Sequence, residues 1–214
     1  MTEPRLYIVG SGGVGQMALQ IANDMKQQNV TNWNLAGVFD DDEERHGEKI
    51  FGVEIRGSVN ELTDVRPGNI VVAVANPKIK LEIAEFIQNG TKHTPITLRH
   101  PDSWIGENVD IGEGSILYPG VKIDPNVHVG KHVQLNKNVT IGHDADIGRG
   151  TTFAPGVNLG GHTDIKRGVY FGINSATIQE LTVEEHVKVG AGATVVGDIP
   201  KNTTVVGNPA EPIK

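Results

Sequence analysis

Two adjacent side chains, His143 and Asp144, form the pair in this sequence that is best suited to acid–base chemistry. A solvent-exposed imidazole changes its protonation state near neutral pH, so it can take a proton from an attacking amine. The neighbouring carboxylate can orient the ring or stabilise the imidazolium. Consecutive side chains diverge in a flat strand, so the pair can act together only where the chain bends. The chain has no cysteine, which excludes disulfides and thiolate chemistry.

A second candidate site lies near the start of the chain, where Gly10, Gly12 and Gly15 fit the pattern G-x-G-x-x-G. Between a strand and a helix, this pattern lets backbone amides and the helix N-terminus hold a diphosphate. NAD binding is the obvious interpretation, but the acidic Asp40 comes about thirty residues later, and the expected strands are too few for two mononucleotide halves. Half of such a site suits a nucleotide linked to another group, such as a nucleotide sugar. The alternative is a tight turn that needs glycine only for its geometry.

Residues 105–200 repeat every six residues without an insertion, and this register decides where His143 lies. The first position of each repeat is apolar in fifteen of sixteen cases, and glycine follows it in eight. The first positions are Ile105, Ile111, Leu117, Ile123, Val129, Leu135, Ile141, Ile147, Phe153, Leu159, Ile165, Phe171, Thr177, Val183, Val189 and Val195.

A period of six fits neither an α-helix, with a period near 3.6, nor an ordinary strand, with a period of 2. It is typical of a parallel β-helix, in which each hexapeptide supplies one short strand and one corner. His143 is the third residue of its repeat, so we expect it at a corner, pointing outward. The other histidines of the repeat region are more simply solvated corner residues, although His162, next to Gly161, can neighbour the site.

The first hundred residues follow a different pattern. Strands are expected at residues 5–9, 35–39, 70–75 and 95–98, and helices at residues 14–28 and 77–88. Continuous apolar strands that alternate with helices indicate a small parallel α/β domain of Rossmann-like type. With a junction at residues 99–104, we predict an α/β domain over residues 1–99 and a β-helix over residues 100–214.

Composition narrows the classes of partner. A net charge of −7 in 214 residues argues against nucleic acid or an anionic membrane as the main partner. No apolar stretch approaches the length that spans a bilayer, and the first residues lead into a strand rather than a signal peptide. We therefore expect a soluble, cytoplasmic protein.

The two parts together resemble the family of sialic-acid O-acetyltransferases and nucleotide-amino-sugar N-acetyltransferases, which joins a small α/β domain to a left-handed parallel β-helix of hexapeptide repeats. The most specific stretch is residues 135–144 (LNKNVTIGHD), where the family has its catalytic histidine followed by an acidic residue. Residues 171–175 (FGINS) and 206–210 (VGNPA) support it. The resemblance covers essentially the whole chain and is strongest to the UDP-4-amino-sugar N-acetyltransferases of bacillosamine biosynthesis.

This resemblance implies an enzyme of surface glycan biosynthesis that moves an acetyl group from acetyl-CoA to the amine of a nucleotide-linked amino sugar, here a UDP-4-amino-4,6-dideoxy sugar. It implies direct transfer without a metal, with His143 as general base beside Asp144 and a backbone amide near Gly161 facing the oxyanion. Acetyl-CoA would lie between two subunits of a homotrimer. The residues implied for acetyl-CoA are Gly161, Ile173, Ala191 and Pro209, and those implied for the nucleotide sugar are Gly10, Ser11, Gly12, Gly13, Asp40, Asp41, Asn76 and Asn136.

Other functions stay open at this point. The nearest is O-acetylation of sialic acid or another sugar. A zinc enzyme is a second, because γ-class carbonic anhydrases hold zinc with three histidines on a similar β-helix. An NAD-dependent sugar oxidoreductase is a third. A non-catalytic scaffold would explain the repeats but neither the His143–Asp144 pair nor the glycine-rich turn.

Overall fold

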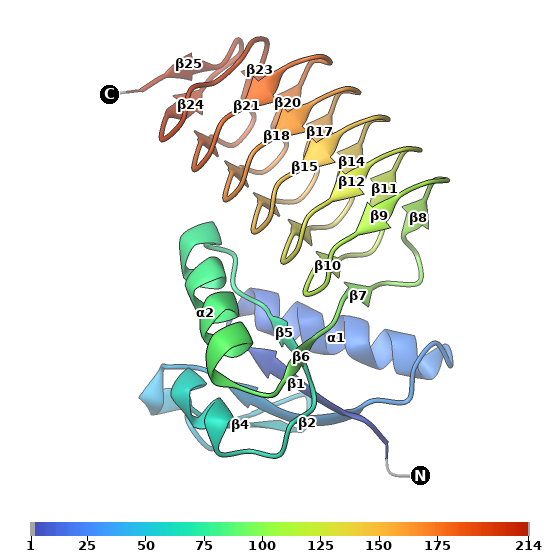
Figure 1. Cartoon of the computed structure of the whole chain (residues 1–214), viewed down its shortest axis with the longest axis vertical. Helices are drawn as coiled ribbons and strands as arrows, with labels where there is room; N and C mark the ends of the chain where they lie inside the picture. The colour runs from blue at the N-terminus through green and yellow to red at the C-terminus, as the bar shows by residue number, and fades with distance from the viewer. Residues whose placement is uncertain (1–2, 214) are drawn as a thin grey trace.

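A computed structural model describes residues 3–213 of the chain. It has two parts, an α/β layer formed by the N-terminal residues and a triangular prism of short strands formed by the rest (Figure 1). Within the described residues, no helix has the length and apolarity needed to cross a bilayer.

The α/β layer is built on one six-stranded sheet with the order β3-β4-β2-β1-β5-β6. Neighbouring strands are parallel except β3 and β4, which form an antiparallel pair at one edge. The strands are β1 (Arg5–Val9), β2 (Asn34–Phe39), β3 (Lys49–Ile50), β4 (Val53–Gly57), β5 (Asn69–Val72) and β6 (Thr94–Pro95). The helices are α1 (Gly13–Gln27) and α2 (Pro77–Gly90), with the 3-10 turns η1 (Glu43–Arg45) and η2 (Val59–Thr63).

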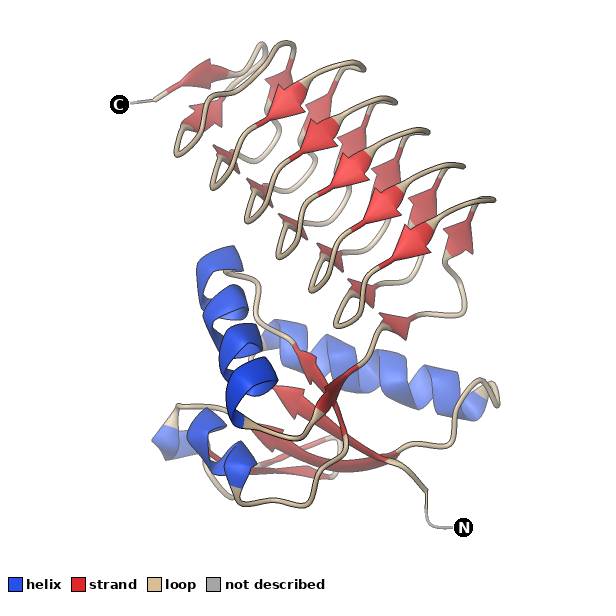
Figure 2. Ribbon diagram, viewed as in Figure 1, coloured by secondary structure: helices blue, strands red, loops and turns tan. Residues whose placement is uncertain are grey.

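Both faces of this sheet are covered, which explains why its central strands read as continuous apolar runs. Successive side chains of a strand point to opposite faces. Leu6 and Ile8 of β1 therefore share a core with α1, whereas Tyr7 and Val9 pack on the side of α2 and η2. Figure 2 shows α1 between the sheet and the prism.

The sheet has six strands, two more than the four expected from the sequence. The sequence analysis missed β3 and β4, because β3 is very short and β4 buries only Ile55 and Gly57. The strand expected over residues 95–98 is confirmed only at Pro95, which lies in β6. β6 ends at Pro95, and Leu98 begins β7 (Leu98–Arg99), which pairs with β10 (Ile116–Leu117) of the prism. The strand expected over residues 70–75 ends earlier, at Val72. A short apolar run does not reveal which neighbour will pair with it.

The prism is a left-handed parallel β-helix with three flat faces, which confirms the fold expected from the six-residue register. Face 1 contains β7, β10, β13 (Gln134–Leu135), β16 (Thr152–Phe153), β19 (Tyr170–Phe171), β22 (Lys188–Val189), β24 (Thr204–Val206) and the antiparallel β25 (Glu211–Pro212). Face 2 contains β8 (Trp104–Ile105), β11 (Lys122–Ile123), β14 (Thr140–Ile141), β17 (Asn158–Leu159), β20 (Ala176–Thr177) and β23 (Thr194–Val195). Face 3 contains β9 (Asp110–Ile111), β12 (His128–Val129), β15 (Asp146–Ile147), β18 (Asp164–Ile165) and β21 (Thr182–Val183).

The core of the prism follows the expected register. The second residue of each two-residue strand is the first of a hexapeptide, and from Leu117 to Val195 each of these is buried. Thr177, the one polar member, accepts a hydrogen bond at its hydroxyl from the Gly160 N–H at 3.0 Å, so its buried oxygen has a partner. Ile105 is only half-buried, because it lies in the first coil, at the open end.

Three edges join the faces, and residues 18 positions apart stack on one another in successive coils. Edge 2/3 carries residues 143–144 and 161–162, edge 3/1 carries residues 149–150, 167–168 and 185–186, and edge 1/2 carries residues 137–138, 173–174 and 191–192. Corner residues with positive φ are mostly Gly or Asn, which tolerate the left-handed region, but Asp144 and His162 also adopt it.

The α/β layer docks on the first coils of face 1. Thr152 points outward from this face and is nevertheless buried, because Lys80 of α2 covers it. The Lys80 ammonium donates to the Thr152 hydroxyl at 2.7 Å and to the Thr151 carbonyl at 3.2 Å. Further along the face, Tyr170 is half-buried and Lys188 is exposed. The α/β layer therefore covers face 1 as far as the coil of Tyr170 and does not cover the coil of Lys188.

Candidate active site

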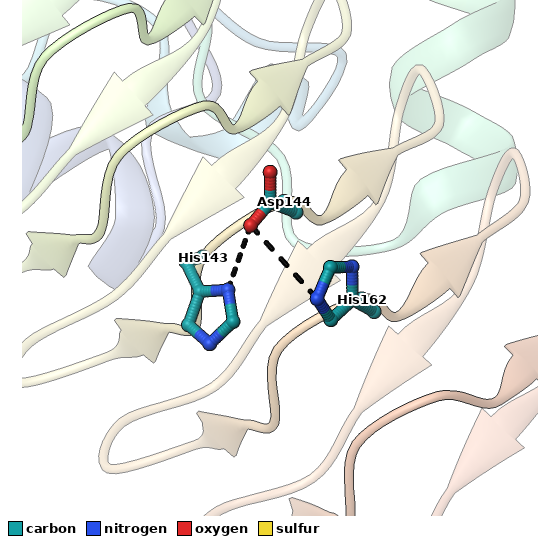
Figure 3. A group of neighbouring side chains, drawn as sticks. All are labelled: His143, Asp144 and His162. Atoms are coloured by element: carbon teal, nitrogen blue, oxygen red, sulfur yellow. Dashed lines mark hydrogen bonds and ion pairs between the residues drawn. The ribbon is translucent and has the colours of Figure 1, made fainter.

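His143 and Asp144 lie on edge 2/3 and form a hydrogen bond, with 2.7 Å between Nδ1 of the imidazole and Oδ2 of the carboxylate (Figure 3). Asp144 has a φ of 57°, and this corner conformation turns its side chain to the same side as the ring. Both side chains face solvent, with 56% and 39% of their surface exposed. The bend that the pair requires is therefore present.

The neighbouring coils support the pair from both sides. In the preceding coil, the side-chain amide of Asn126 donates to Oδ1 of Asp144 at 3.2 Å. In the following coil, the His162 ring meets the His143 ring edge to face, with centroids 5.0 Å apart. Nε2 of His162 lies 4.0 Å from Oδ2 of Asp144. His162 is therefore a direct neighbour of the pair and not only a solvated corner residue.

The hydrogen bond decides which nitrogen of His143 can act as a base. The bond from His143 lowers the pKa of the Asp144 carboxyl, so this group is an ionised acceptor. In the neutral form of the ring, Nδ1 then carries the donated proton and Nε2 has the lone pair. The arrangement can accept a proton at Nε2 while the carboxylate holds the ring.

The free nitrogen of His143 faces Gly161, one coil further along the edge. A Cβ atom at residue 161 would lie 2.9 Å from Nε2 and 3.0 Å from Cε1 of His143, so glycine is needed to leave the ring in place. Within residues 3–213 the Gly161 N–H has no hydrogen-bond acceptor and can donate to a ligand. The amides of Ile173 and Ala191 are open at the equivalent corner position. What distinguishes Gly161 is the imidazole beside it.

The residues expected to bind acetyl-CoA do not gather at one place in the chain. Gly161 lies beside His143 on edge 2/3. Ile173 and Ala191 lie on edge 1/2, at the other border of face 2, and Pro209 lies beyond the last coil. Asn136, expected to bind the nucleotide sugar, also lies on edge 1/2. A single chain therefore presents the imidazole and Gly161 on one edge, and Ile173 and Ala191 on another.

The glycine-rich turn joins β1 to α1 at the carboxyl end of the sheet. Packing explains two of its glycines, because Gly10 has a φ of 104° and a Cβ atom at Gly15 would overlap the Gly10 carbonyl. Among the residues that the structure describes, none apart from the adjoining residues of the chain has an atom within 4 Å of where a Cβ atom of Gly12 or Gly13 would lie. The geometry of a tight turn therefore explains why residues 10 and 15 are glycine. It does not explain Gly12 and Gly13, whose backbone is accessible at the N-terminus of α1.

The acidic residues after β2 have partners within the chain. Asp40 accepts from the Ser11 N–H at 2.5 Å and from the Asp42 N–H at 3.0 Å. Burial raises the pKa of Asp40, but the hydrogen bonds from Ser11 and Asp42 outweigh it, so the pKa is lowered overall. Asp41 accepts from the Val59 N–H at 2.9 Å. Both carboxylates therefore brace the loops around the turn, a role that the sequence did not indicate.

Two further side chains lie near this turn. Asn76 caps α2 by accepting from the backbone N–H of Lys78 at 3.0 Å. Arg45 was not expected at the site, yet its guanidinium donates to the Ser11 carbonyl at 3.0 Å and to its hydroxyl at 2.6 Å. No local pattern marks Arg45, because only the tertiary fold brings it to a residue 34 positions away.

His143, Asp144 and His162 also have the donor types of a metal site, and their donor atoms lie within 4.8 Å of one another. However, the 2.7 Å between Nδ1 of His143 and Oδ2 of Asp144 is a direct hydrogen-bond distance. Two ligands of one tetrahedral zinc ion, each about 2.0–2.1 Å from the metal, would be about 3.3 Å apart. The geometry fits an acid–base pair better than a preformed metal site.

Two family models match the chain. The model described as "PglD N-terminal domain" matches residues 5–87, and the model described as "Bacterial transferase hexapeptide (six repeats)" matches residues 126–161. With the imidazole–carboxylate pair on an edge of the prism, the fold and site define a hexapeptide-repeat acyltransferase that carries an additional α/β domain.

Individual relatives narrow this class. The chain is 33% identical over 216 residues to the GDP-perosamine N-acetyltransferase of Escherichia coli O157:H7, covering 97% of this chain and 95% of that protein. The acetyltransferase domain of PglB from Neisseria gonorrhoeae FA1090, solved with acetyl coenzyme A, superposes with a TM-score of 0.88 at 28% identity over 99% of this chain and 100% of that one. WeeI from Acinetobacter baumannii AYE gives 0.84 at 25% identity over 97% and 99%. The chain belongs to the family of nucleotide-amino-sugar N-acetyltransferases, which use acetyl-CoA.

Proposed function

We propose that the protein transfers an acetyl group from acetyl-CoA to the amine of an amino sugar linked to a nucleoside diphosphate, with His143 as the general base. The observation that carries this proposal is the His143 ring, whose Nδ1 is held by Asp144 while Nε2 faces Gly161. A relative named for GDP-perosamine and a structure solved with acetyl coenzyme A support the choice of substrates. The family resemblance implies a UDP-4-amino-4,6-dideoxy sugar, whereas the relative is named for a GDP-linked sugar, so UDP- and GDP-linked sugars are the acceptors to compare.

Transfer proceeds directly between the two substrates. The sugar amine attacks the thioester carbonyl carbon while Nε2 of His143 takes a proton from the nitrogen. The carbonyl oxygen becomes an oxyanion, to which the Gly161 N–H donates. The carbon–sulfur bond then breaks, and the proton on Nε2 passes to the departing CoA thiolate. Asp144 stabilises the imidazolium between these steps.

The proposal includes a homotrimer, in which His143 of one chain meets the acetyl-CoA contacts of its neighbour. Face 2 lies between the two edges that must meet. Its outward side chains from the third coil on are short and uncharged, namely Thr140, Asn158, Ala176 and Thr194, whereas face 3 presents Asp110, His128, Asp146 and Asp164. Packing face 2 around a threefold axis would bring edge 2/3 of one chain to edge 1/2 of the next. The exposed Ile173, at 53%, would be covered there.

The nucleotide end of the acceptor is assigned to the α/β layer. The accessible backbone at Gly12 and Gly13 suits a phosphate group, and Arg45 holds the neighbouring Ser11 by hydrogen bonds. In this proposal residues 1–99 bind the nucleotide, whereas residues 100–214 bind acetyl-CoA and carry the chemistry. The cytoplasmic location and the role in surface glycan synthesis belong to the same proposal.

The test is a thiol-release assay with acetyl-CoA and a panel of UDP-, dTDP- and GDP-linked amino sugars. Wild-type protein should release CoA with at least one acceptor. His143→Ala should lower kcat by about a hundred- to ten-thousandfold, because the amine loses its proton acceptor, while acetyl-CoA binding stays intact.

The chain offers a matched control. His128 is also exposed and also pairs with a carboxylate, Asp110, at 3.1 Å, but it lies on face 3. His128→Ala should therefore retain wild-type turnover. Near-normal kcat in His143→Ala would remove His143 as the base, and an equal loss in both variants would point to a general effect on the prism.

A further inference from the structure

A groove of about 840 Å³ lies between the amino end of α2 and edge 3/1 of the prism. Its walls include Asn76 and Lys78 at the start of α2, and Arg149, Arg167, Tyr170 and Lys188 on the prism. The volume is within the range of small-molecule sites. Neither His143 nor Asp144 lines it, so it is separate from the acid–base pair within the chain.

The groove gathers positive charge in a chain whose net charge is −7. Its ionic lining residues are Lys78, Arg149, Arg167 and Lys188 against Glu82 and Glu85. Three of these cations form exposed ion pairs, with 4.0 Å between Lys78 and Glu82, 3.4 Å between Arg149 and Glu85, and 3.9 Å between Arg167 and Glu185. Lys188 forms no ion pair within residues 3–213. Loosely paired, exposed cations can exchange these partners for an anionic ligand.

The groove lies near both substrate regions of the proposed function, although its lining includes neither the glycine-rich turn nor a residue of edge 1/2. One end is lined by residues 75–77, which follow β5. The same strand end contacts the glycine-rich turn, because a Cβ atom at Gly10 would lie 2.6 Å from the Ala73 carbonyl oxygen. Toward the other end, Tyr170 stands on face 1, three residues before Ile173 on edge 1/2. An acceptor held by its nucleotide at the turn would cross this part of face 1 to bring its amine to acetyl-CoA.

We propose that this groove binds the diphosphate and sugar of the acceptor, with Arg167 and Lys188 pairing with the phosphates and the half-buried ring of Tyr170 packing against the sugar. The inference rests on the proposed function and adds the part of the prism that recognises the acceptor. The turn supplies N–H donors, but its nearby cation, Arg45, is already engaged by Ser11 and Glu48. The prism side chains supply the charge that a diphosphate needs.

Steady-state kinetics of Arg167→Ala, Lys188→Ala and the double variant test the proposal. Each single change should raise the KM for the nucleotide sugar by about tenfold or more, with little change in the KM for acetyl-CoA. Lys188→Arg should restore most of the loss. Lys131→Ala is the matched control, because Lys131 lies on the same edge outside the groove. It should behave as wild type.

CoA also carries phosphates, so it could bind the same cations. Comparing the KM for the nucleotide sugar with the KM for acetyl-CoA shows which of the two substrates uses the groove. A rise in the KM for acetyl-CoA alone, or unchanged constants in the double variant, would overturn the assignment. Calorimetric titration with UDP, dTDP and GDP separates this inference from the proposed function, because it needs no turnover. Weaker binding of a nucleoside diphosphate in the double variant supports the groove even if no sugar of the panel is acetylated. Equal binding in wild type and double variant contradicts it.

Discussion

At the corner formed by residues 143–144, the backbone conformation of Asp144 determines which nitrogen of the His143 ring is free. A positive φ at Asp144 brings its carboxylate to the side of the His143 ring, and the bond to Nδ1 leaves Nε2 free. In the next coil, Gly161 lies beside Nε2 and Cε1 of the same ring and leaves just enough space for it. The position of the His143 imidazole thus depends on Gly161, a neighbour that makes no hydrogen bond with the ring.

Gly161→Ala should test this confinement. The added methyl group would come within 3.0 Å of the His143 ring, so either the imidazole or the corner must shift. A displacement of about 1 Å at a reacting group can cost around a hundredfold in rate. We expect kcat to fall by roughly ten- to a hundredfold while the far-ultraviolet circular dichroism spectrum stays unchanged.

Gly197→Ala provides the comparison, because a Cβ atom there has nothing within 4 Å. That variant should keep wild-type kcat. If Gly161→Ala also keeps it, the contact between residue 161 and the imidazole has no influence on the rate.

At the scale of elements, α2 joins the two parts of the molecule. Its first residues line the groove, and one turn later Lys80 and Leu81 pack on the prism. Lys80 is completely buried, and within residues 3–213 its ammonium has hydroxyl and carbonyl acceptors but no carboxylate. Burial lowers the pKa of Lys80 to about 7. The docking of α2 is therefore sensitive to protonation.

The sign of this effect follows from the lowered pKa. At pH values between about 7 and the ordinary lysine value of 10.5, the unfolded chain binds a proton that the folded chain does not. The free energy of unfolding should therefore decrease by about 1.4 kcal/mol for each unit by which pH falls through this window. Below pH 7 both states are protonated, and this contribution no longer changes.

Urea unfolding of wild type and Lys80→Met at several pH values from 7 to 10 measures this effect. Methionine has a similar length and no titrating group, so the difference between the two proteins isolates Lys80. Wild type should lose stability relative to the variant as pH falls. Parallel curves would show that Lys80 does not titrate in this range. His132, which was expected to be a solvated corner residue, is instead buried, and this burial lowers its pKa to about 4, so it titrates only below this window.

At the scale of the whole molecule, one chain presents its candidate site residues in separate places. The imidazole lies on edge 2/3, Ile173 and Ala191 lie on edge 1/2, and the cationic groove lies at edge 3/1. A flat face separates each edge from the next. The proposed trimer would resolve this separation, because the edge of a neighbouring chain could approach where the chain's own edge does not.

Mixed assembly tests the shared site. His143→Ala and Ile173→Asp should each be inactive alone, since one loses the base and the other loses an acetyl-CoA contact. When the two are co-expressed and assemble at random, about one interface in four combines an intact His143 with an intact Ile173, so about a quarter of wild-type turnover should return. Sedimentation should show trimers for each variant alone and for the mixture. No recovery in mixed trimers, or an active wild-type monomer, would contradict the shared site.

The sequence by itself determined the prism and the place of His143 within it. Each inward residue contacts residues one coil away, so the six-residue register repeats a local rule and can be read directly. The family resemblance was equally accessible, because the LNKNVTIGHD stretch and the glycine-rich turn are contiguous. β3 and β4 were missed, and residues 95–98 were divided between two sheets, because strand pairing depends on partners distant in sequence.

Only the tertiary structure decided which side chains meet across those distances. It placed Arg45 against Ser11, buried Lys80 beneath the prism, and lined one groove with residues as far apart as Lys78 and Lys188. The register positions each corner along the prism but does not say which edge the α/β layer covers. Which edge is covered depends on how one apolar surface packs against another, and such packing produces no periodic pattern in the sequence.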